Sequence, residues 1–117
     1  MTKIFVFGSN KSGIHGAGSA LHAKRHYGAK YGIGVGRTGN SYAIPTKDAN
    51  LQVLPLSEIE IYVKGFLIYA TNHPELTFDV VPIGCGLAGY EAKDIAPMFR
   101  GHTSNVNLPK CFLDIIG

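Results

Sequence analysis

The sequence lacks the features that mark secreted, zinc-binding and membrane proteins. It has no tryptophan and two cysteines, Cys85 and Cys111, among 117 residues, which are too few for a disulfide framework and are not spaced like a zinc site. The longest apolar runs, such as Ile4–Phe7 and Phe66–Ala70, fall well short of the roughly 20 residues that span a bilayer. Because a strand-like run follows Met1 almost at once, no signal peptide is expected. We therefore expect a cytoplasmic protein without a membrane anchor, a bound metal or a cofactor.

Charged residues are also few, and basic residues exceed acidic ones only slightly. Eleven basic and eight acidic residues give a formal net charge of +3 at pH 7, a mild excess that suits an anionic small ligand without requiring a nucleic-acid groove. The basic residues are scattered except at 24–26, and a short basic cluster is typical of the last turn of a helix. We therefore do not expect direct binding to nucleic acid.

In place of these features the sequence alternates buried strands, glycine-rich loops and helices. Ile4–Phe7 is a continuous β-prone run ended by Gly8, which is typical of a parallel strand buried on both faces. After a glycine-rich stretch, residues at helical spacing predict a helix from about Ala17 to Tyr27. Gly28 stands where a C-terminal cap would.

The clearest helix is predicted over residues 57–72, where apolar residues recur with the spacing of one buried face. Ser57 and Glu60 are spaced as a capping box at its start, and Pro74 ends it. The other expected elements are a loop or irregular hairpin at 31–40, a strand at 41–44 ending at Pro45, a strand at 78–83 broken only by Pro82, a short helix around 95–99 confined or kinked by Pro97, and a closing strand at 106–108 or 112–116. This order predicts one α/β domain over residues 1–117, with three α/β/α layers and a mixed or mostly parallel sheet.

The first glycine-rich loop, residues 8–20, leaves a predicted strand and enters a predicted helix. Glycines allow backbone N–H groups to approach phosphate oxygens, and a helix N-terminus adds partial positive charge. The loop lacks the Gly-Lys-Ser/Thr ending of a P-loop and fits the Rossmann fingerprint poorly, and a tight structural turn would use the same glycines. Its candidate ligand contacts are Gly8, Ser9, Asn10, Gly13, Gly16, Ala17 and Gly18.

A second glycine-rich loop, residues 82–90, again follows a strand and precedes a helix. Ligands of open α/β sheets bind beyond the carboxyl ends of the strands. Two such loops at adjacent strand ends are therefore placed to grip a diphosphate from both sides, with Tyr90 free to cover a sugar or base face. The candidate contacts of this loop are Gly84, Cys85, Gly86, Leu87, Ala88, Gly89 and Tyr90.

Three segments carry a resemblance to a known family. They are Gly16-Ala17-Gly18 before a helix that ends near Tyr27-Gly28, Ile44-Pro45-Thr46-Lys47 at a strand end, and Ile83-Gly84-Cys85-Gly86-Leu87. Over roughly residues 4 to 100 the chain resembles macrodomains, most closely the class that includes the terminal ADP-ribose glycohydrolases. The resemblance implies a macrodomain-like fold and binding of ADP-ribose or a related nucleotide.

The same resemblance implies a role for Lys47. In that class a lysine at this position attacks the anomeric carbon of the ribose, and an acidic residue after the Gly-Cys-Gly-Leu segment assists release. That acidic position is Ala88 in this chain. Asp48, Glu91 and Asp94 are near enough in sequence to substitute for it, although acids at helix starts usually complement the helix dipole.

Other positions keep two interpretations open. Asn10 matches an asparagine that contacts the distal ribose in other macrodomain classes, or is a turn residue. His15 is a candidate acid, base or phosphate partner, or a merely exposed or hydrogen-bonded loop histidine. Cys85 lies near a helix start, where thiolates can be stabilised, but the family treats it as loop structure. Most macrodomains recognise adenine with an added strand and a Gly-Asp turn, for which residues 1–3 leave no space.

The leading hypothesis is therefore a module that binds ADP-ribose or an ADP-ribose-like metabolite. One alternative is a glycohydrolase that removes ADP-ribose from a protein or nucleic acid, with Lys47, Asn10 and His15 as candidate catalytic residues. Another is a protein that sequesters a nucleotide signal derived from NAD. The expected partners are the small molecule and, for the hydrolase, an ADP-ribosylated macromolecule.

Overall fold

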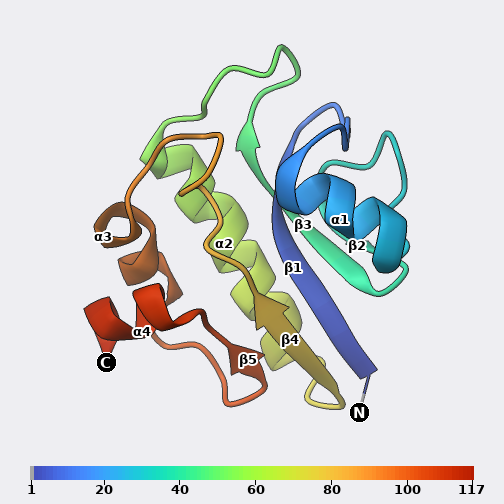
Figure 1. Cartoon of the computed structure of the whole chain (residues 1–117). Helices are drawn as coiled ribbons and strands as arrows, with labels where there is room; N and C mark the ends of the chain where they lie inside the picture. Colours follow the sequence, from blue (N-terminus) through green and yellow to red (C-terminus); the bar gives the residue numbers. More distant parts are fainter. Residues whose placement is uncertain (1) are drawn as a thin grey trace.

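Strands from distant parts of the sequence form one five-stranded sheet. The computed structural model describes residues 2–117 (Figure 1). The strands, in the spatial order β2-β3-β1-β4-β5, are β1 (Thr2–Asn10), β2 (Gly36–Thr38), β3 (Ser41–Lys47), β4 (Leu76–Val80) and β5 (Val106–Asn107). β1 pairs in parallel with both β3 and β4, β4 pairs in parallel with β5, and β2 pairs antiparallel with β3. The expected mostly parallel, mixed sheet is confirmed.

Helices cover both faces of this sheet. They are α1 (Gly18–His26), α2 (Leu56–Thr71), α3 (Ala92–Ile95) and α4 (Lys110–Ile116), with a 3₁₀ turn η1 at Ala96–Phe99. Ile4 and Val6 of β1 belong to the larger core shared with α2, η1 and α4, whereas Phe7 belongs to the smaller core beneath α1. The three-layer α/β/α architecture is therefore confirmed, and β1 is buried from both sides as its apolar run predicts.

The start of the long helix differs from the prediction. α2 begins at Leu56, with Pro55 as the N-cap residue and no side-chain hydrogen bond to the cap. The capping box of Ser57 and Glu60 was therefore wrong. Ser57 lies one residue inside the first turn, because the helix starts at the position after Pro55, whose ring already has a helix-compatible φ.

Three strand boundaries also need correction. β3 continues through Pro45 to Lys47, because β2 pairs only with residues 41–43 and the missing N–H of Pro45 interrupts no ladder on that edge. β4 ends at Val80, ahead of the proline at residue 82 that was expected to lie within it. Of the two candidates for the closing strand, Val106–Asn107 is the strand, and residues 112–116 lie in α4.

The topology brings the two glycine-rich loops together. β1 and β4 are parallel neighbours, so the loops that follow them leave the same edge of the sheet, beside the end of β3 (Figure 1). In residues 2–117, no helix is both long enough and apolar enough to cross a bilayer.

Asn105 connects elements at the opposite edge, and its replacement should destabilise the fold. Its side-chain amide nitrogen lies 3.0 Å, 3.1 Å and 3.2 Å from the carbonyl oxygens of Ala70, His73 and Leu76. Asn105→Ala removes the side-chain donor that links these three carbonyls, and we expect the free energy of unfolding to fall by about 2 kcal/mol. Asn107→Ala is the matched control, because its amide bonds only the exposed Asp79 carboxylate. Equal urea midpoints for the two variants would contradict the role of Asn105.

Candidate functional site

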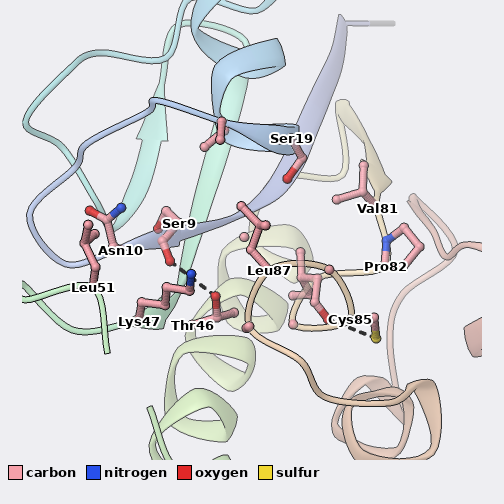
Figure 2. A pocket seen from close by; sticks show the side chains of 18 of the residues that line it. Ser9, Asn10, Ser19, Thr46, Lys47, Leu51, Val81, Pro82, Cys85 and Leu87 are labelled. Carbon is pink, nitrogen blue, oxygen red and sulfur yellow. Dashed lines mark hydrogen bonds between the residues drawn. The ribbon is translucent and has the colours of Figure 1, made fainter. Parts of the chain in front are cut away.

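The carboxyl ends of β1, β3 and β4 surround a pocket of about 670 Å³ (Figure 2). Both glycine-rich loops contribute to its wall. Among the predicted ligand and catalytic residues, those that line it are Gly8, Ser9, Asn10, Gly16, Ala17, Gly18, Lys47, Gly84, Cys85, Gly86, Leu87 and Ala88. The other predicted residues, Gly13, His15, Gly89 and Tyr90, lie outside the lining. The structure thus brings the two loops to one cavity, as the strand order requires.

Sequence reasoning did not single out several other lining residues as ligand contacts, namely Ile14, Ser19, Ala20, Thr46, Leu51, Val81, Pro82 and Ile83. Most of them are neighbours in sequence of a predicted contact, so widening each motif by two residues would have included them. Leu51 is different, because it lies on the connection between β3 and α2, outside either loop. No glycine, charge or spacing marked that connection as part of the site.

Free backbone donors face the pocket from the first loop. The first turn of α1 has no side-chain cap, and its first inward hydrogen bond runs from the N–H of Leu21 to the carbonyl of Ala17. Within the described chain, no group accepts a hydrogen bond from the N–H groups of residues 16–20. These residues all line the pocket, so the N-terminus of α1 offers it unpaired donors together with the positive end of the helix dipole.

The second loop offers a similar set of donors. In the described part of the chain, nothing accepts a hydrogen bond from the N–H groups of residues 86–88. The second loop lies against the first loop, because a Cβ on Gly18 would lie 3.8 Å from Cδ1 of Leu87. Donors from two directions therefore border one cavity.

Two pocket glycines are not required by the fold. Gly16 and Gly86 do not have the positive φ that favours glycine, and a Cβ on either would meet no atom within 4 Å. Both line the pocket, so the space left by their missing side chains belongs to the cavity. This is where a ligand could approach the backbone closely.

Asn10 fixes the shape of the first loop. Its Oδ1 accepts hydrogen bonds from the backbone N–H of Ile14 at 3.0 Å and from Oγ of Ser12 at 2.8 Å. Its Nδ2 donates to the carbonyl of Ile14 at 2.9 Å. The oxygen of this side chain is fully engaged within the protein, so Asn10 acts here as a positioning residue for residues 10–14.

Tyr90 anchors the second loop. Its hydroxyl donates to the carbonyl of Leu54 at 2.7 Å, and its N–H donates to the carbonyl of Gly84 at 2.8 Å. The expectation that Tyr90 is free to cover a sugar or base does not match this geometry. Its ring packs against the larger core instead.

Lys47 is the one charged residue that lines the pocket. It is half-buried and forms no ion pair with any group in residues 2–117. Lys11, by contrast, is paired with Glu58, and the hydrogen bond that its ammonium donates to the Glu58 carboxylate raises the pKa of Lys11. Lys47 therefore remains available to an anionic ligand.

The carboxylates that could replace the acid expected at Ala88 have structural roles. Oδ1 of Asp48 accepts hydrogen bonds from the N–H groups of Asn50 at 2.8 Å and Gln52 at 3.0 Å. Glu91 and Asp94 form a capping box at the start of α3. None of the three lines the pocket. Among the residues described, no group of three or more His, Cys, Asp or Glu side chains could hold a metal ion.

The thiol of Cys85 is not activated. Burial, with smaller contributions from Cys111 and Asp94, raises the pKa of Cys85 above its ordinary value. Its Sγ lies 3.6 Å from the carbonyl oxygen of Ile83. A thiol of this kind is a poor nucleophile at neutral pH, which agrees with a role in loop structure.

Leu51 occupies a strained position at the rim. Of the residues described, it is the one non-glycine residue with a left-handed backbone, at φ 63°. It lies in a tight turn in which its N–H donates to the carbonyl of Asp48 at 3.1 Å. An L-residue in this conformation costs roughly 1–2 kcal/mol, and Leu51 lines the pocket while 49% exposed. Strain of this kind is concentrated at ligand-binding sites.

His15 lies beneath the first loop. It is 2% exposed, and its ring meets that of Phe7 edge-on at 5.5 Å between centroids. Neither ring nitrogen reaches hydrogen-bond geometry with a described group. Burial lowers the pKa of His15 below its ordinary value, and the nearby Lys24 lowers it further, while the backbone of Ile33 opposes the shift.

Acidification should therefore destabilise the protein through His15. The unfolded chain binds a proton at this histidine near pH 6.5, whereas the folded protein resists protonation. The stabilising contribution is complete above pH 6.5 and falls as the pH drops below it, by up to about 1.4 kcal/mol per pH unit. Urea denaturation of the wild type and of His15→Leu across this range would measure it. If the two free energies of unfolding change in parallel, His15 makes no such contribution.

Comparisons with protein-family models, with curated proteins and with solved structures gave no match for this chain.

Proposed function

We propose that this protein is a macrodomain-like module that binds ADP-ribose or a related nucleotide derived from NAD. The observation that carries the proposal is the set of unpaired backbone N–H groups, at residues 16–20 and 86–88, on two sides of one pocket. Such donors bind phosphate oxygens, and two facing sets suit a diphosphate better than a single phosphate. Lys47 adds the positive charge that a doubly anionic group requires.

The size and wall of the pocket support the same class of ligand. Its volume of about 670 Å³ lies within the range of sites for nucleotide-sized molecules. The wall combines backbone donors with apolar side chains and contains no carboxylate, so a diphosphate meets no like charge there. We also propose that the protein works in the cytoplasm, where nucleotides derived from NAD are present.

Lys47 gives a second candidate function, removal of ADP-ribose from a protein or nucleic acid. Its position in the pocket and its lack of an ion partner among the described residues favour this alternative. Glycosidic cleavage also needs a group that assists the departure of the leaving group. The carboxylates of Asp48, Glu91 and Asp94 are held by structural hydrogen bonds, so binding is better supported than turnover. Sequestration of a nucleotide signal would require binding alone.

Gly86→Val should weaken binding by well over tenfold, because a branched side chain would occupy space that the ligand's anion needs. Isothermal titration calorimetry with ADP-ribose, AMP, NAD and cyclic ADP-ribose would measure the affinities. Gly65→Val is the matched control: this glycine also lacks a positive φ and has no atom within 4 Å of its Cβ position, but it lies on the exposed side of α2. Failure of every nucleotide to bind the wild type at about millimolar concentration, the weak limit for a specific site, would refute the proposal.

Trapping would separate binding from hydrolysis. If Lys47 attacks the ribose, incubation with an ADP-ribosylated protein followed by borohydride should give an ADP-ribosyl adduct in the intact mass, and Lys47→Ala should remove it. The binding proposal expects no adduct and no released ADP-ribose. Lys64→Ala, on the exposed face of α2, controls for loss of a lysine elsewhere. An adduct that depends on Lys47 would overturn binding as the principal function.

A further inference from the structure

The pocket has a polar end and an apolar end, set by the order of the strands. Ser9, Asn10, Thr46 and Lys47 gather where β1 and β3 finish side by side. β4 lies on the other side of β1, and apart from Ser19 the side chains that line the pocket there are apolar. They are Val81, Pro82 and Ile83 after β4, Ala20 on α1, and Leu87 in the second loop. Figure 2 shows Ser9, Asn10, Thr46 and Lys47 on one side and Val81 and Pro82 on the other, with Leu87 reaching into the middle.

The apolar end presents carbon surface to solvent. Leu87 is 73% exposed, although it leans toward the start of α1, where a Cβ on Gly18 would touch it. Val81 is half-buried and Pro82 is exposed. A flat aromatic ring placed between these side chains would remove them from water, which is favourable for any ring of similar size.

Most polar side chains of the pocket are already occupied by the chain's own backbone. Oγ of Ser9 donates to the carbonyl of Gly34, Oγ1 of Thr46 donates to the carbonyl of Ser9 at 3.3 Å, and Cys85 contacts the carbonyl of Ile83. The side-chain oxygen of Asn10 is also engaged. Of the lining residues, only Ser19 and Lys47 keep a polar side-chain group without a partner.

The Ser19 hydroxyl and the Lys47 ammonium cannot distinguish one base from another through the hydrogen-bonding groups on the edge of the base. Lys47 lies at the polar end, and Figure 2 shows Ser19 on the other side of the pocket. The Ser19 hydroxyl both donates and accepts hydrogen bonds, so it pairs equally well with an amino group or a carbonyl. Strong discrimination requires a buried polar group that the wrong ligand leaves unpaired, whereas Ser19 is only half-buried and pairs with either kind of group.

We infer that the pocket selects its ligand through the diphosphate, and holds the base as a flat apolar ring without distinguishing one base from another. The class of ligand is thus a nucleoside diphosphate linked to ribose, with adenine, hypoxanthine, guanine or uracil as the base. This inference rests on the proposed function, because it assumes that a diphosphate lies between the glycine-rich loops.

Titration calorimetry with ADP-ribose and its hypoxanthine, guanine and uracil counterparts tests the inference, with two riboses joined 5 to 5 through a diphosphate, which is ADP-ribose without its adenine, as the probe without a base. We expect the purine ligands to bind within about threefold of one another and uracil within about tenfold, because its smaller ring buries less area. The probe without a base should bind at least about tenfold more weakly, since it leaves the apolar end in water.

The outcomes are distinct. A preference for adenine of more than about tenfold over hypoxanthine, which differs in hydrogen bonding at nearly equal ring area, would overturn the inference and leave nucleotide binding intact. Equal affinity for the probe without a base would also overturn it, because the apolar end would then hold no ring. No binding by any of the five ligands would refute the proposed function itself, and the inference with it.

A variant tests which side chains hold the ring. Leu87→Ala should weaken every base-containing ligand by a similar factor of about three to ten, and should change the affinity for the probe without a base little. Leu113→Ala is the matched control, because this leucine is also exposed, at 42%, but lies on α4 and does not line the pocket. A Leu87→Ala effect confined to one base would contradict the inference.

Discussion

The first loop keeps its shape because neighbouring backbone comes too close to it for any added side chain to fit. A Cβ on Gly34 would lie 2.0 Å from the carbonyl oxygen of Asn10, and one on Gly13 would lie 2.3 Å from the carbonyl carbon of Gly32. The segment at 32–34 is therefore locked against residues 10–13. Since this loop leads directly into α1, the direction of the N–H groups that face the pocket depends on these contacts.

The distribution of charge around the pocket follows from where the acidic residues are used. Asp48 closes the turn after β3, Glu91 and Asp94 cap α3, and Glu58 pairs with Lys11. Carboxylates are thus engaged in holding loops around the cavity while the wall itself contains none. Backbone dipoles and one lysine therefore border the cavity without a carboxylate that would repel an anion.

The parts of this architecture that the sequence predicted depend on local signals. The run at Ile4–Phe7, the helix before Gly28 and the order of strand, glycine loop and helix are all visible within short windows, and parallel pairing then places the loops together. The capping box at Ser57 was wrong because its spacing also occurs one residue inside a helix that begins earlier. Ligand identity is not tested by any of this and stays a proposal.

What could not be predicted depends on contacts between distant residues. The hydroxyl of Tyr90 bonds a carbonyl 36 residues away. His15, for which the sequence left a functional, an exposed or a hydrogen-bonded role open, is buried, and its ring nitrogens have no partner among the described residues. The turn at Leu51 could not be predicted from its sequence, because glycine or asparagine is the usual residue at a left-handed position in a hairpin turn. The geometry of the hairpin, and not the preference of leucine, sets this conformation. Long-range packing, and not composition, determines these features.

The two faces of the sheet are unequally filled. The smaller core beneath α1 contains Phe7 and four alanines, at 20, 23, 29 and 43, which lets the helix lie close to the strands but provides little apolar area. Segments with few apolar contacts open at lower free energy than the whole domain. The start of α1, and with it the unpaired donors at residues 16–20, therefore belongs to the part of the molecule whose backbone amides should exchange with solvent first. An anion bound between the loops would slow that exchange by tying the helix to the opposite loop.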